Sequence, residues 1–450
     1  MTLYDLWDRL PRQARAELLS RSAGARGWWV PDALPGRWEA LRPLVFSAPD
    51  YHRFGELAAG VLRCALLACR RRAGTAGELY RALDDHREPR LLDPAQPLSD
   101  PALPRLARPD ALLAGGRPWF VELNVGPNIY GVPGLDRRAA AFARYWPDGT
   151  LVAPPSTLRA RAAALARAVP GPAGGRARVL VPTWRAASGI AAKLDGVRAL
   201  RRYLRPAAQA AAAAGLEVTV ADLSEVRGGA DGLWVGEERV DVVFNQFLGA
   251  VVTDTAALGV LREAVLAGGV RLFVPEASCL LGAKRVLAWM HEDLDRYPPA
   301  DRELIEGHVP WTAWLGPGQC AARRRLILAR AARERTGLVV KPSCGHGGTG
   351  FVSGAEVTER EWLDLLARRS GEETLVLQRR LVPDTARMRF RSLDGACGTA
   401  RVPFVLSPFL LNGRPAGAHV RHASPDSPAG APVNTAAGAV SNTVLLLPDP

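Results

Sequence analysis

The residues best suited to chemistry surround Lys341, one of only three lysines in a chain whose 58 basic residues are otherwise arginine. Lys341 ends an apolar stretch and precedes a loop with glycine at Gly345, Gly347, Gly348 and Gly350. A compact ammonium reaches a phosphate where the broad, planar guanidinium needs more room, so a lysine kept in an arginine-rich chain indicates phosphate binding. Glycines let backbone N–H groups close over an anion. The segment therefore predicts a phosphate site.

The Lys341 loop differs from two familiar glycine-rich phosphate motifs. Its lysine precedes the glycines and no Gly-Lys-Ser/Thr follows, so it is not a Walker A motif. Phe351 and Val352 continue as an apolar strand, so the loop does not open a helix. We expect a glycine flap between two strands that covers phosphates. A flexible hairpin with an incidental lysine is the alternative.

A second constellation lies in the segment 107–125, which has the pattern of a β-hairpin. With the turn centred on Gly116, Asp110 lies opposite Glu122 and Arg108 opposite Asn124. Two carboxylates opposed across a ladder repel each other unless a cation lies between them. Carboxylate and amide oxygens are ligands that Mg²⁺ takes when nucleotide phosphates complete its shell. The hairpin therefore predicts a Mg²⁺ site, with a solvated polar face as the alternative.

The alternation of side chains in this hairpin also predicts its two faces. One face is expected to hold Trp119, Val121, Leu123 and Val125, and the other Phe120, Glu122 and Asn124.

Two further features are weak when taken alone. Leu375–Gln378 has the pattern of a buried strand whose end could meet a nucleotide base or ribose, although a core strand is the simpler interpretation. Lys284 begins a predicted helix, Ala283–His291, where an exposed lysine is the ordinary interpretation.

Composition excludes several classes of protein. The net charge of +13 invites a nucleic-acid interpretation, but the arginines are scattered beside Glu and Asp in helical stretches, with no basic stripe interleaved with aromatic residues. An anionic small substrate fits the charge at least as well. The six cysteines form no CxxC pair, and reduced thiols are expected. With no signal-peptide pattern and no apolar run of membrane-spanning length, a cytoplasmic soluble protein is predicted.

Hydrophobic periodicity divides the chain into four predicted parts. Residues 1–105 read as a helical region, with helices at Tyr4–Leu19, Tyr51–Arg72 and Thr75–Leu83. Residues 106–175 hold the charged hairpin and two helices, and 176–275 alternate strands with helices as in a parallel sheet. Residues 276–450 hold the glycine loop and later strands. The expected fold class is α/β (α+β).

Taken together, these segments resemble circularly permuted ATP-grasp enzymes, the glutathionylspermidine-synthetase-like group. In that group the acidic metal ligands precede the glycine loop, and its Arg-x-Asp and Glu-x-Asn pairs match Arg108, Asp110, Glu122 and Asn124. The resemblance covers roughly 105–130 and 240–450. Two departures stand out: Gln378 is followed by arginine where the group commonly has Glu, and the loop reads Ser-Cys-Gly-His-Gly-Gly-Thr-Gly.

The resemblance implies an ATP-grasp fold, the cofactors ATP and Mg²⁺, and a carboxylate–amine ligase working through an acyl phosphate. It implies that Asp110, Glu122 and Asn124 hold the metal and that Arg108 steadies the transferring phosphoryl. Arg421, on the expected strand Ala418–His422, is expected to reach the γ-phosphate or a substrate carboxylate, with a structural arginine as the equal alternative. The implied nucleotide-binding residues are Lys284, Lys341, Gly345, His346, Gly347, Gly348, Thr349, Gly350, Leu377 and Gln378.

Two other functions stay open at this point. One is a non-catalytic nucleotide-binding module, and the other is a phosphotransferase or thiol ligase that uses the same site. The expected partners are a small carboxylate and a small amine, with no nucleic acid and no membrane. The sequence does not predict an oligomeric state.

Overall fold

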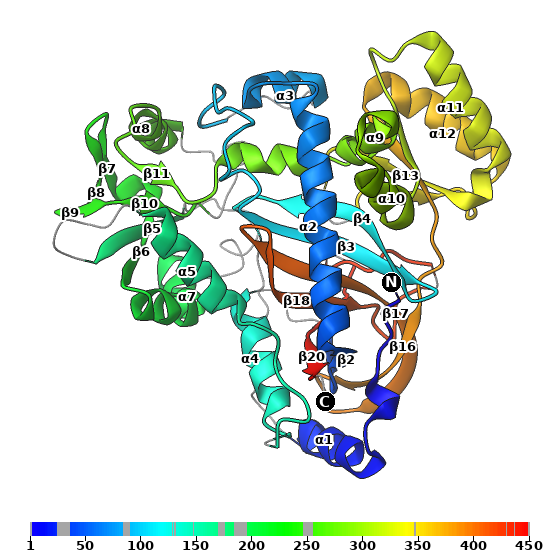
Figure 1. Cartoon of the computed structure of the whole chain (residues 1–450), viewed down its shortest axis with the longest axis horizontal. Helices are drawn as coiled ribbons and strands as arrows, with labels where there is room; N and C mark the ends of the chain where they lie inside the picture. The colour runs from blue at the N-terminus through cyan, green and yellow to red at the C-terminus, as the bar shows by residue number, and fades with distance from the viewer. Residues whose placement is uncertain are drawn as a thin grey trace.

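A computed structural model describes residues 2–24, 37–83, 91–127, 129, 132–146, 148–169, 176–183, 196–245, 255–345, 348–428, 430–435 and 437–448. It is a mixed α/β structure built around several sheets, with the long helix α2 (Ala48–Arg70) crossing the centre of the molecule (Figure 1). Among the described helices, none is both long and apolar enough to pass through a bilayer.

The largest sheet has seven strands and forms one wall of the molecule's central cleft. Its members are β1 (Trp38–Ala40), β3 (Leu106–Ala114), β4 (Arg117–Val125), β16 (Thr385–Ser392), β17 (Cys397–Leu411), β18 (Arg414–His422) and β19 (Val440–Asn442). The long strand β17 joins them, because Cys397–Pro403 pairs with β16 and the residues from Val405 onward pair with both β18 and β3. The predicted 107–125 hairpin is therefore part of a wide sheet.

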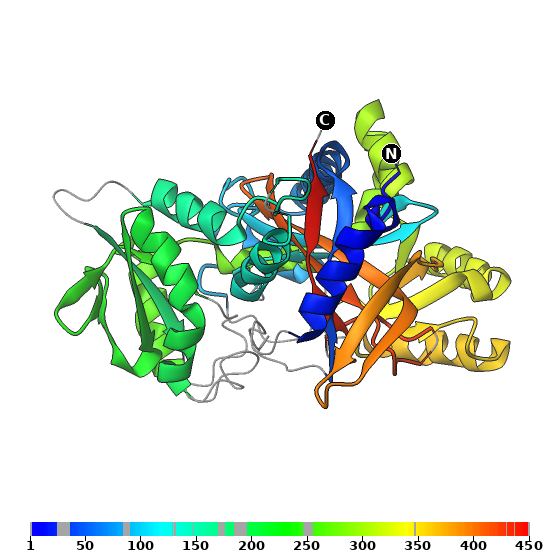
Figure 2. The ribbon, with the colours of Figure 1, turned by 90° about the horizontal axis from the view of Figure 1, so that it is seen from below.

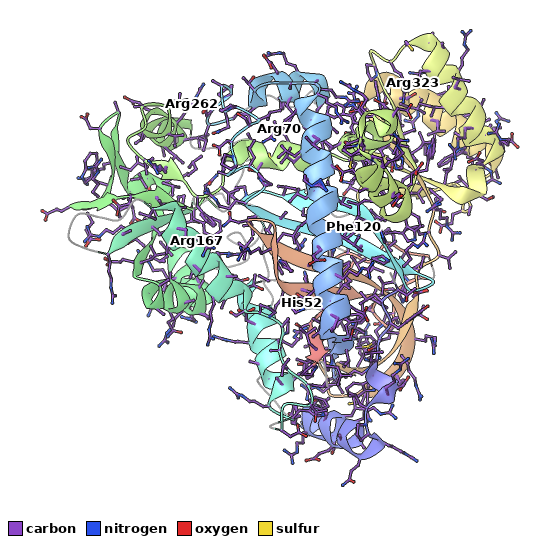
Figure 3. The ribbon with its side chains drawn as sticks, in the orientation of Figure 1. His52, Arg70, Phe120, Arg167, Arg262 and Arg323 are labelled. Atoms are coloured by element: carbon purple, nitrogen blue, oxygen red, sulfur yellow. The ribbon has the colours of Figure 1, made fainter. Side chains whose placement is uncertain are left out.

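Helix α2 covers the apolar face of this sheet (Figure 1). Ser47 caps the helix by accepting a hydrogen bond from the Asp50 N–H. The Phe54 ring stacks on Phe120 of β4, with centroids 5.7 Å apart, and Figure 3 shows Phe120 next to the helix. At Gly55 a Cβ would lie 2.5 Å from Pro415 Cβ, so only glycine permits this approach of α2 to β18. The packing fixes β4, which carries Glu122.

A four-stranded antiparallel sheet forms the opposite wall. Its order is β12 (Thr312–Leu315), β15 (Leu375–Arg379), β13 (Leu338–Pro342) and β14 (Val352–Ser353). Helices α11 (Ala321–Arg333) and α12 (Glu359–Glu372) pack on it around the fully buried Trp362. The expected strands on both sides of the glycine loop and at Leu375–Gln378 are confirmed.

A parallel sheet forms the core of a separate lobe, visible at one end of the molecule in Figure 2. Its order is β11 (Arg271–Leu272), β10 (Val242–Val243), β5 (Ala177–Thr183) and β6 (Leu216–Asp222), and all neighbouring strands are parallel, as predicted. The helices around it are α5 (Thr157–Ala168), α7 (Gly196–Ala213) and α8 (Thr255–Leu266). A meander of β7 (Val226–Gly229), β8 (Gly232–Val235) and β9 (Glu238–Val240) and the short η2 (Leu223–Glu225) complete the lobe.

The N-terminal region is not wholly helical, which corrects one prediction. Its helices are η1 (Trp7–Arg9), α1 (Arg12–Gly24), α2 and α3 (Ala76–Leu83), so the helix expected at Tyr4–Leu19 begins later. Two strands were missed: β1 pairs with β16, and β2 (Leu44–Ser47) pairs in parallel with β20 (Val444–Leu447). Both strands are too short to show periodicity and depend on partners more than 340 residues away. The four-part division of the chain stays a prediction.

The other helices in the described parts of the chain lie between these layers. They are α4 (Val132–Ala143), η4 (Glu276–Gly282), α9 (Arg285–Glu292), η5 (Leu294–Arg296), α10 (Pro299–His308) and η6 (Arg335–Gly337). Of these, η4 and α9 matter for the site, because Lys284 stands between them.

Candidate active site

The seven-stranded and four-stranded sheets face each other across a cavity of about 650 Å³. Six cationic and three anionic side chains line it: Lys284, Lys341, Arg379, Arg380, Arg401 and Arg421 against Asp110, Glu122 and Glu356. Two of the carboxylates already hold a cation of this set, since Asp110 pairs with Arg421 and Glu122 with Lys284. The cavity therefore carries an excess of positive charge, which favours a polyanionic ligand.

The hairpin that carries the two acidic residues has the predicted register at those residues but not near its turn, where Ala114 pairs with Arg117. Asp110 lies opposite Glu122, and Arg108 lies opposite Asn124. A β-bulge follows Asp110, and it overturns the predicted faces of the hairpin. Because Ala111 pairs with Phe120, Phe120 joins the core with Leu123, while Val121 lines the cavity beside Glu122. Period-two alternation could not reveal this inserted residue.

Asp110 is the most enclosed acidic residue of the site. Its Oδ2 accepts from Arg421 Nη2 at 2.5 Å, and its Oδ1 accepts from Ser407 Oγ at 2.8 Å. Arg108 Nε lies 3.8 Å from Oδ1. Burial acts to raise the pKa of Asp110, but the two arginines and the hydrogen bonds outweigh it and hold that pKa below its ordinary value. Burial also lowers the pKa of Arg108 to about 10 against the opposing effect of Asp110. Asp110 is therefore ionised at neutral pH.

Glu122 and Lys284 connect the hairpin to the glycine loop. Lys284 Nζ lies 3.1 Å from Glu122 Oε1 and donates to the Gly345 carbonyl at 2.9 Å. At Gly282 a Cβ would lie 2.7 Å from the Leu123 carbonyl oxygen, so glycine lets η4 approach β4 closely enough to position Lys284. The lysine thus joins one wall of the cavity to its cover, which the exposed-helix interpretation did not anticipate.

Lys341 extends from β13 into the same cavity. Its Nζ donates to Gln378 Oε1 on the neighbouring strand at 2.9 Å, and Gln378 Nε2 donates to Thr312 Oγ1 at 3.2 Å. Burial lowers the pKa of Lys341 to about 8, with Lys284 lowering it further and Glu122 and Asp110 opposing the shift. The ammonium has no carboxylate within ion-pair distance in the described part of the chain. It is held in place by an amide and can pair with an anion.

The glycine loop connects two antiparallel strands, as predicted, because Val340 pairs with Val352. Gly348 and Gly350 both have positive φ, at 76° and 73°, where other residues are strained. A Cβ on Gly348 would lie 2.7 Å from Asn434 Nδ2. Gly345, Gly348 and Thr349 line the cavity, while the predicted binding residues His346 and Gly347 lie outside the described residues.

Some predicted site residues do not line the cavity. Leu377 lies in the core under α11 and α12, and its strand is paired on both edges, so it presents neither side chain nor free backbone to a ligand. Inward and outward residues alternate along a central strand, and Gln378 is the one that faces the cavity, while the nucleotide-binding role of Leu377 stays a prediction. Arg108 and Asn124 lie behind the lining, with Asn124 Nδ2 donating to the Arg108 carbonyl at 3.1 Å. Gly350 also lies outside the lining.

Two lining segments were missed. Arg380–Pro383 joins β15 to β16, and therefore one wall to the other, and it includes the 74% exposed Val382. Residues 424, 425, 427, 428 and 430–434 also border the cavity, including Ser424, Ser427 and Asn434. Prolines (Pro383 in the first segment, three in the second) are typical of irregular structure, but no sequence signal located the segments at the cleft.

The oxygen donors on the hairpin fit a hard divalent cation. Asp110 and Glu122 lie opposite each other and both line the cavity. Over the described residues there is no group of three or more His, Cys, Asp or Glu that could form a protein-only metal site. Two carboxylates completed by phosphate oxygens and water is the donor set that Mg²⁺ takes at nucleotide sites. The set is compatible with Mg²⁺, and the metal-binding role of these residues stays a prediction.

Comparison with known proteins gives the fold. No family model and no curated protein matches the sequence. The structure is similar to a glutathione synthetase-like effector from Globodera pallida, with a TM-score of 0.55, 13% identity, and coverage of 97% of this chain and 98% of that one. A putative gamma-glutamylcysteine synthetase from Methylobacillus flagellatus has a TM-score of 0.37 at 15% identity (71% and 76% covered). D-alanyl-alanine synthetase A from Vibrio cholerae has a TM-score of 0.29 at 14% identity (51% and 67% covered).

Only the first similarity is close enough to support an argument. It shows that this chain shares its overall fold with a glutathione synthetase-like effector. The predicted mixed α/β fold class is therefore confirmed, while the ATP-grasp assignment and the circular permutation stay predictions.

Proposed function

We propose that this protein is an ATP-dependent carboxylate–amine ligase that forms an amide bond through an acyl phosphate. The observation that carries the proposal is the excess of cations in a cavity between two sheets, with Lys341 held by an amide beside a glycine loop. This arrangement suits a nucleoside triphosphate. The fold shared with a glutathione synthetase-like protein supports the same class of reaction.

In the proposed reaction a carboxylate oxygen of the first substrate attacks the γ-phosphorus of ATP, and the bond from that phosphorus to the bridging oxygen breaks to release ADP. The amine nitrogen of the second substrate then attacks the acyl carbon and expels phosphate, losing a proton to give the amide. The protein contributes mainly by positioning the reactants and stabilising charge.

Five charged residues of the cavity have a task in this proposal. Lys341 pairs with ATP phosphates from inside the cavity, and Lys284 holds the glycine loop against the hairpin. Arg421, kept in place by Asp110 and Ser407, stabilises charge on the transferred phosphoryl group. Mg²⁺ held by Asp110 and Glu122 would supply charge neutralisation for the phosphates. The glycine loop excludes water from the acyl phosphate.

The proposed function is tested by incubating the protein with ATP, Mg²⁺ and pools of carboxylates and amines. ADP and phosphate in equal amounts, together with a product whose mass equals acid plus amine minus water, support the ligase. ATP binding without ADP formation in any pool supports a non-catalytic nucleotide-binding module. The ion pairs that already occupy Asp110 and Glu122 favour that second candidate.

A further inference from the structure

The wall formed by the seven-stranded sheet continues along β16 and β17, which lie side by side (Figure 1). Met388 and Phe390 of β16 lie in the core, so the alternating residues Arg387 and Arg389 belong to the opposite face. Arg401 of β17 is paired directly with Arg387 and therefore shares this face, and it also lines the cavity. These three arginines, all exposed, form a strip that begins at the cavity and is called the arginine strip below.

The arginine strip sets like charges against each other. Residues directly opposed in an antiparallel ladder have Cβ atoms about 5 Å apart, so two cations there are destabilising. Arg387 and Arg401 are such a pair. Among the residues that the structure describes, no carboxylate lies within ion-pair distance of any member of the strip, and the adjacent Glu39 pairs with Arg391 instead. Arg401 Nη1 donates to Thr385 Oγ1 at 3.4 Å, a neutral partner. An anion from outside the chain would relieve this repulsion.

The spacing of the strip fits an extended row of carboxylates. Residues on one face of a strand repeat about every 7 Å, and so do alternate side chains of an extended peptide. Val405 of β17 lies opposite Arg421, and Arg401 precedes it by four residues on the same face, so about 14 Å separates the two rows. Arg389, opposite Thr399, lies one row further. An extended peptide of about six residues therefore spans the distance from the end of the strip to Arg421.

The composition of this face favours a peptide over a single-stranded nucleic acid. Its other members beside the strip are Thr385, Thr399 and Pro403, so it carries no aromatic ring. Proteins that bind single strands stack the bases on aromatic side chains, and such a platform is absent from this face. The planar fork of a guanidinium matches the two oxygens of a carboxylate.

We propose that the arginine strip binds an acidic peptide segment in extended form and directs its terminal carboxylate into the cavity beside Arg421. Each bound carboxylate pairs with a guanidinium that the described residues leave without an acid, and the repulsion between Arg387 and Arg401 is relieved. That the delivered carboxylate is a substrate rests on the proposed ligase function. The binding of the peptide itself does not.

The test uses the full-length protein without nucleotide. Hexaglutamate labelled with fluorescein at its N-terminus is titrated with protein, and fluorescence anisotropy is followed. We expect saturable binding that weakens as the salt concentration rises. Hexaglutamine with the same label should not bind, and labelled hexathymidylate should bind at least about tenfold more weakly than hexaglutamate.

Variants of the sheet make the test specific. The triple variant Arg387→Gln/Arg389→Gln/Arg401→Gln should weaken binding of hexaglutamate at least about tenfold, and Arg401→Gln alone about threefold. Arg414→Gln removes one charge from an exposed position at the start of β18; it is the matched control for Arg401→Gln and should bind as wild type. Arg387→Glu places a carboxylate opposite Arg401, so it should abolish binding while leaving Tm without ligand unchanged or higher.

The proposal is overturned if the wild type does not bind hexaglutamate saturably, if hexathymidylate binds as tightly, or if the triple variant keeps wild-type affinity. An equal loss of affinity in Arg414→Gln and Arg401→Gln would show attraction to the net charge alone and would also overturn it. A lower Tm in Arg387→Glu with unchanged peptide affinity would assign the strip a structural role instead. Because nucleotide is absent throughout, a failure here leaves the ligase proposal standing, and a protein that binds the peptide but forms no ADP supports the strip alone.

Discussion

The two walls of the cleft differ in how their charged side chains are paired. On the seven-stranded sheet, Asp110, Arg421 and Ser407 form a closed, buried network in which the acid is already neutralised. On the four-stranded sheet, Lys341 donates to Gln378 and, among the residues that the structure describes, pairs with no carboxylate, so its charge stays available. One wall is thus preorganised through ion pairs, whereas the other presents a cation that a ligand must neutralise. The seven-stranded sheet thus supplies the rigid part of the site, and the four-stranded sheet supplies the cation that a ligand can pair with.

The largest loss of stability should come from removing the carboxylate of the buried network. Asp110→Asn removes the charge that pairs with Arg421 and leaves two guanidiniums facing each other, so we expect a loss of about 3–5 kcal/mol in the free energy of unfolding. Urea unfolding measures it. Ser407→Ala removes one hydrogen bond but keeps the ion pair and should cost about 1 kcal/mol.

The pH dependence of the Asp110 variant gives a second check. The pKa of Asp110 is lower in the folded protein than in the unfolded chain. Its ionised form therefore contributes fully to the free energy of unfolding above the ordinary carboxyl pKa, and this contribution is lost as the pH falls through the lowered pKa of the folded protein. Wild type and Asp110→Asn should therefore converge in stability on acidification below about pH 4. Equal stability of the two proteins at neutral pH would show that the buried network does not stabilise the seven-stranded wall.

Lys341→Arg is expected to weaken ATP binding, with a smaller change in free energy than the loss expected for Asp110→Asn. The guanidinium keeps the charge but needs more room than the site beside Gln378 provides, so ATP affinity should fall at least about tenfold while stability changes little. Titration calorimetry with ATP and Mg²⁺ measures this. Wild-type affinity in Lys341→Arg would mean that the second wall needs only charge and not the shape of a lysine.

Raising the pH should deprotonate Lys341 and so change both stability and ATP affinity. Its pKa is lowered to about 8 in the folded protein from 10.5, so the unfolded chain binds more protons between these values and unliganded stability should rise with pH there. ATP affinity should fall over the same range, because binding needs the ammonium form. In Lys341→Met the contribution of this group to both trends should be absent. A wild-type affinity independent of pH between 7 and 9.5 would contradict the assignment of Lys341 to the phosphates.

Substitutions in the glycine loop test how tightly the four-stranded wall packs around Gly350. In Gly350→Ala the methyl group meets Pro342 and Arg369 at 2.9 Å in a left-handed conformation, so we expect a loss of at least about 1–2 kcal/mol. Gly115→Ala has a similar positive φ in the β3–β4 turn with nothing within 4 Å, and it isolates the backbone contribution. Equal losses in the two variants would mean that the Gly350 contacts are unimportant.

The smallest stability effect is expected at Glu122. Its side chain is 30% exposed, so breaking its pair with Lys284 in Glu122→Gln should change the free energy of unfolding by less than about 1 kcal/mol. The same variant should lose ATP-dependent turnover. Normal phosphate release by a folded Glu122→Gln protein would contradict the predicted role of Glu122 in metal binding.

The sequence predicted those parts of the site that depend on local pattern. The pairing of Asp110 with Glu122 was predicted from a turn centred on Gly116, and the scarcity of lysine pointed to Lys284 and Lys341, which both line the cleft. The turn is Gly115–Gly116, and the pair forms because a bulge after Asp110, which has no signature in the alternation of residues, shifts the register by one residue. Ser407 and the pairing of Arg421 with Asp110 depend on strands about 300 residues apart. Such contacts are set by tertiary structure and have no local signal.

The most direct test of the central claim, that this cleft activates a carboxylate with ATP, is trapping with hydroxylamine. The wild-type protein is incubated with ATP, Mg²⁺, a carboxylate pool and hydroxylamine, and hydroxamates are identified by mass spectrometry. The account predicts one hydroxamate for each ADP formed, and none with Glu122→Gln. ATP binding with neither hydroxamate nor ADP in any pool, or ADP formation that does not depend on a carboxylate, would contradict it.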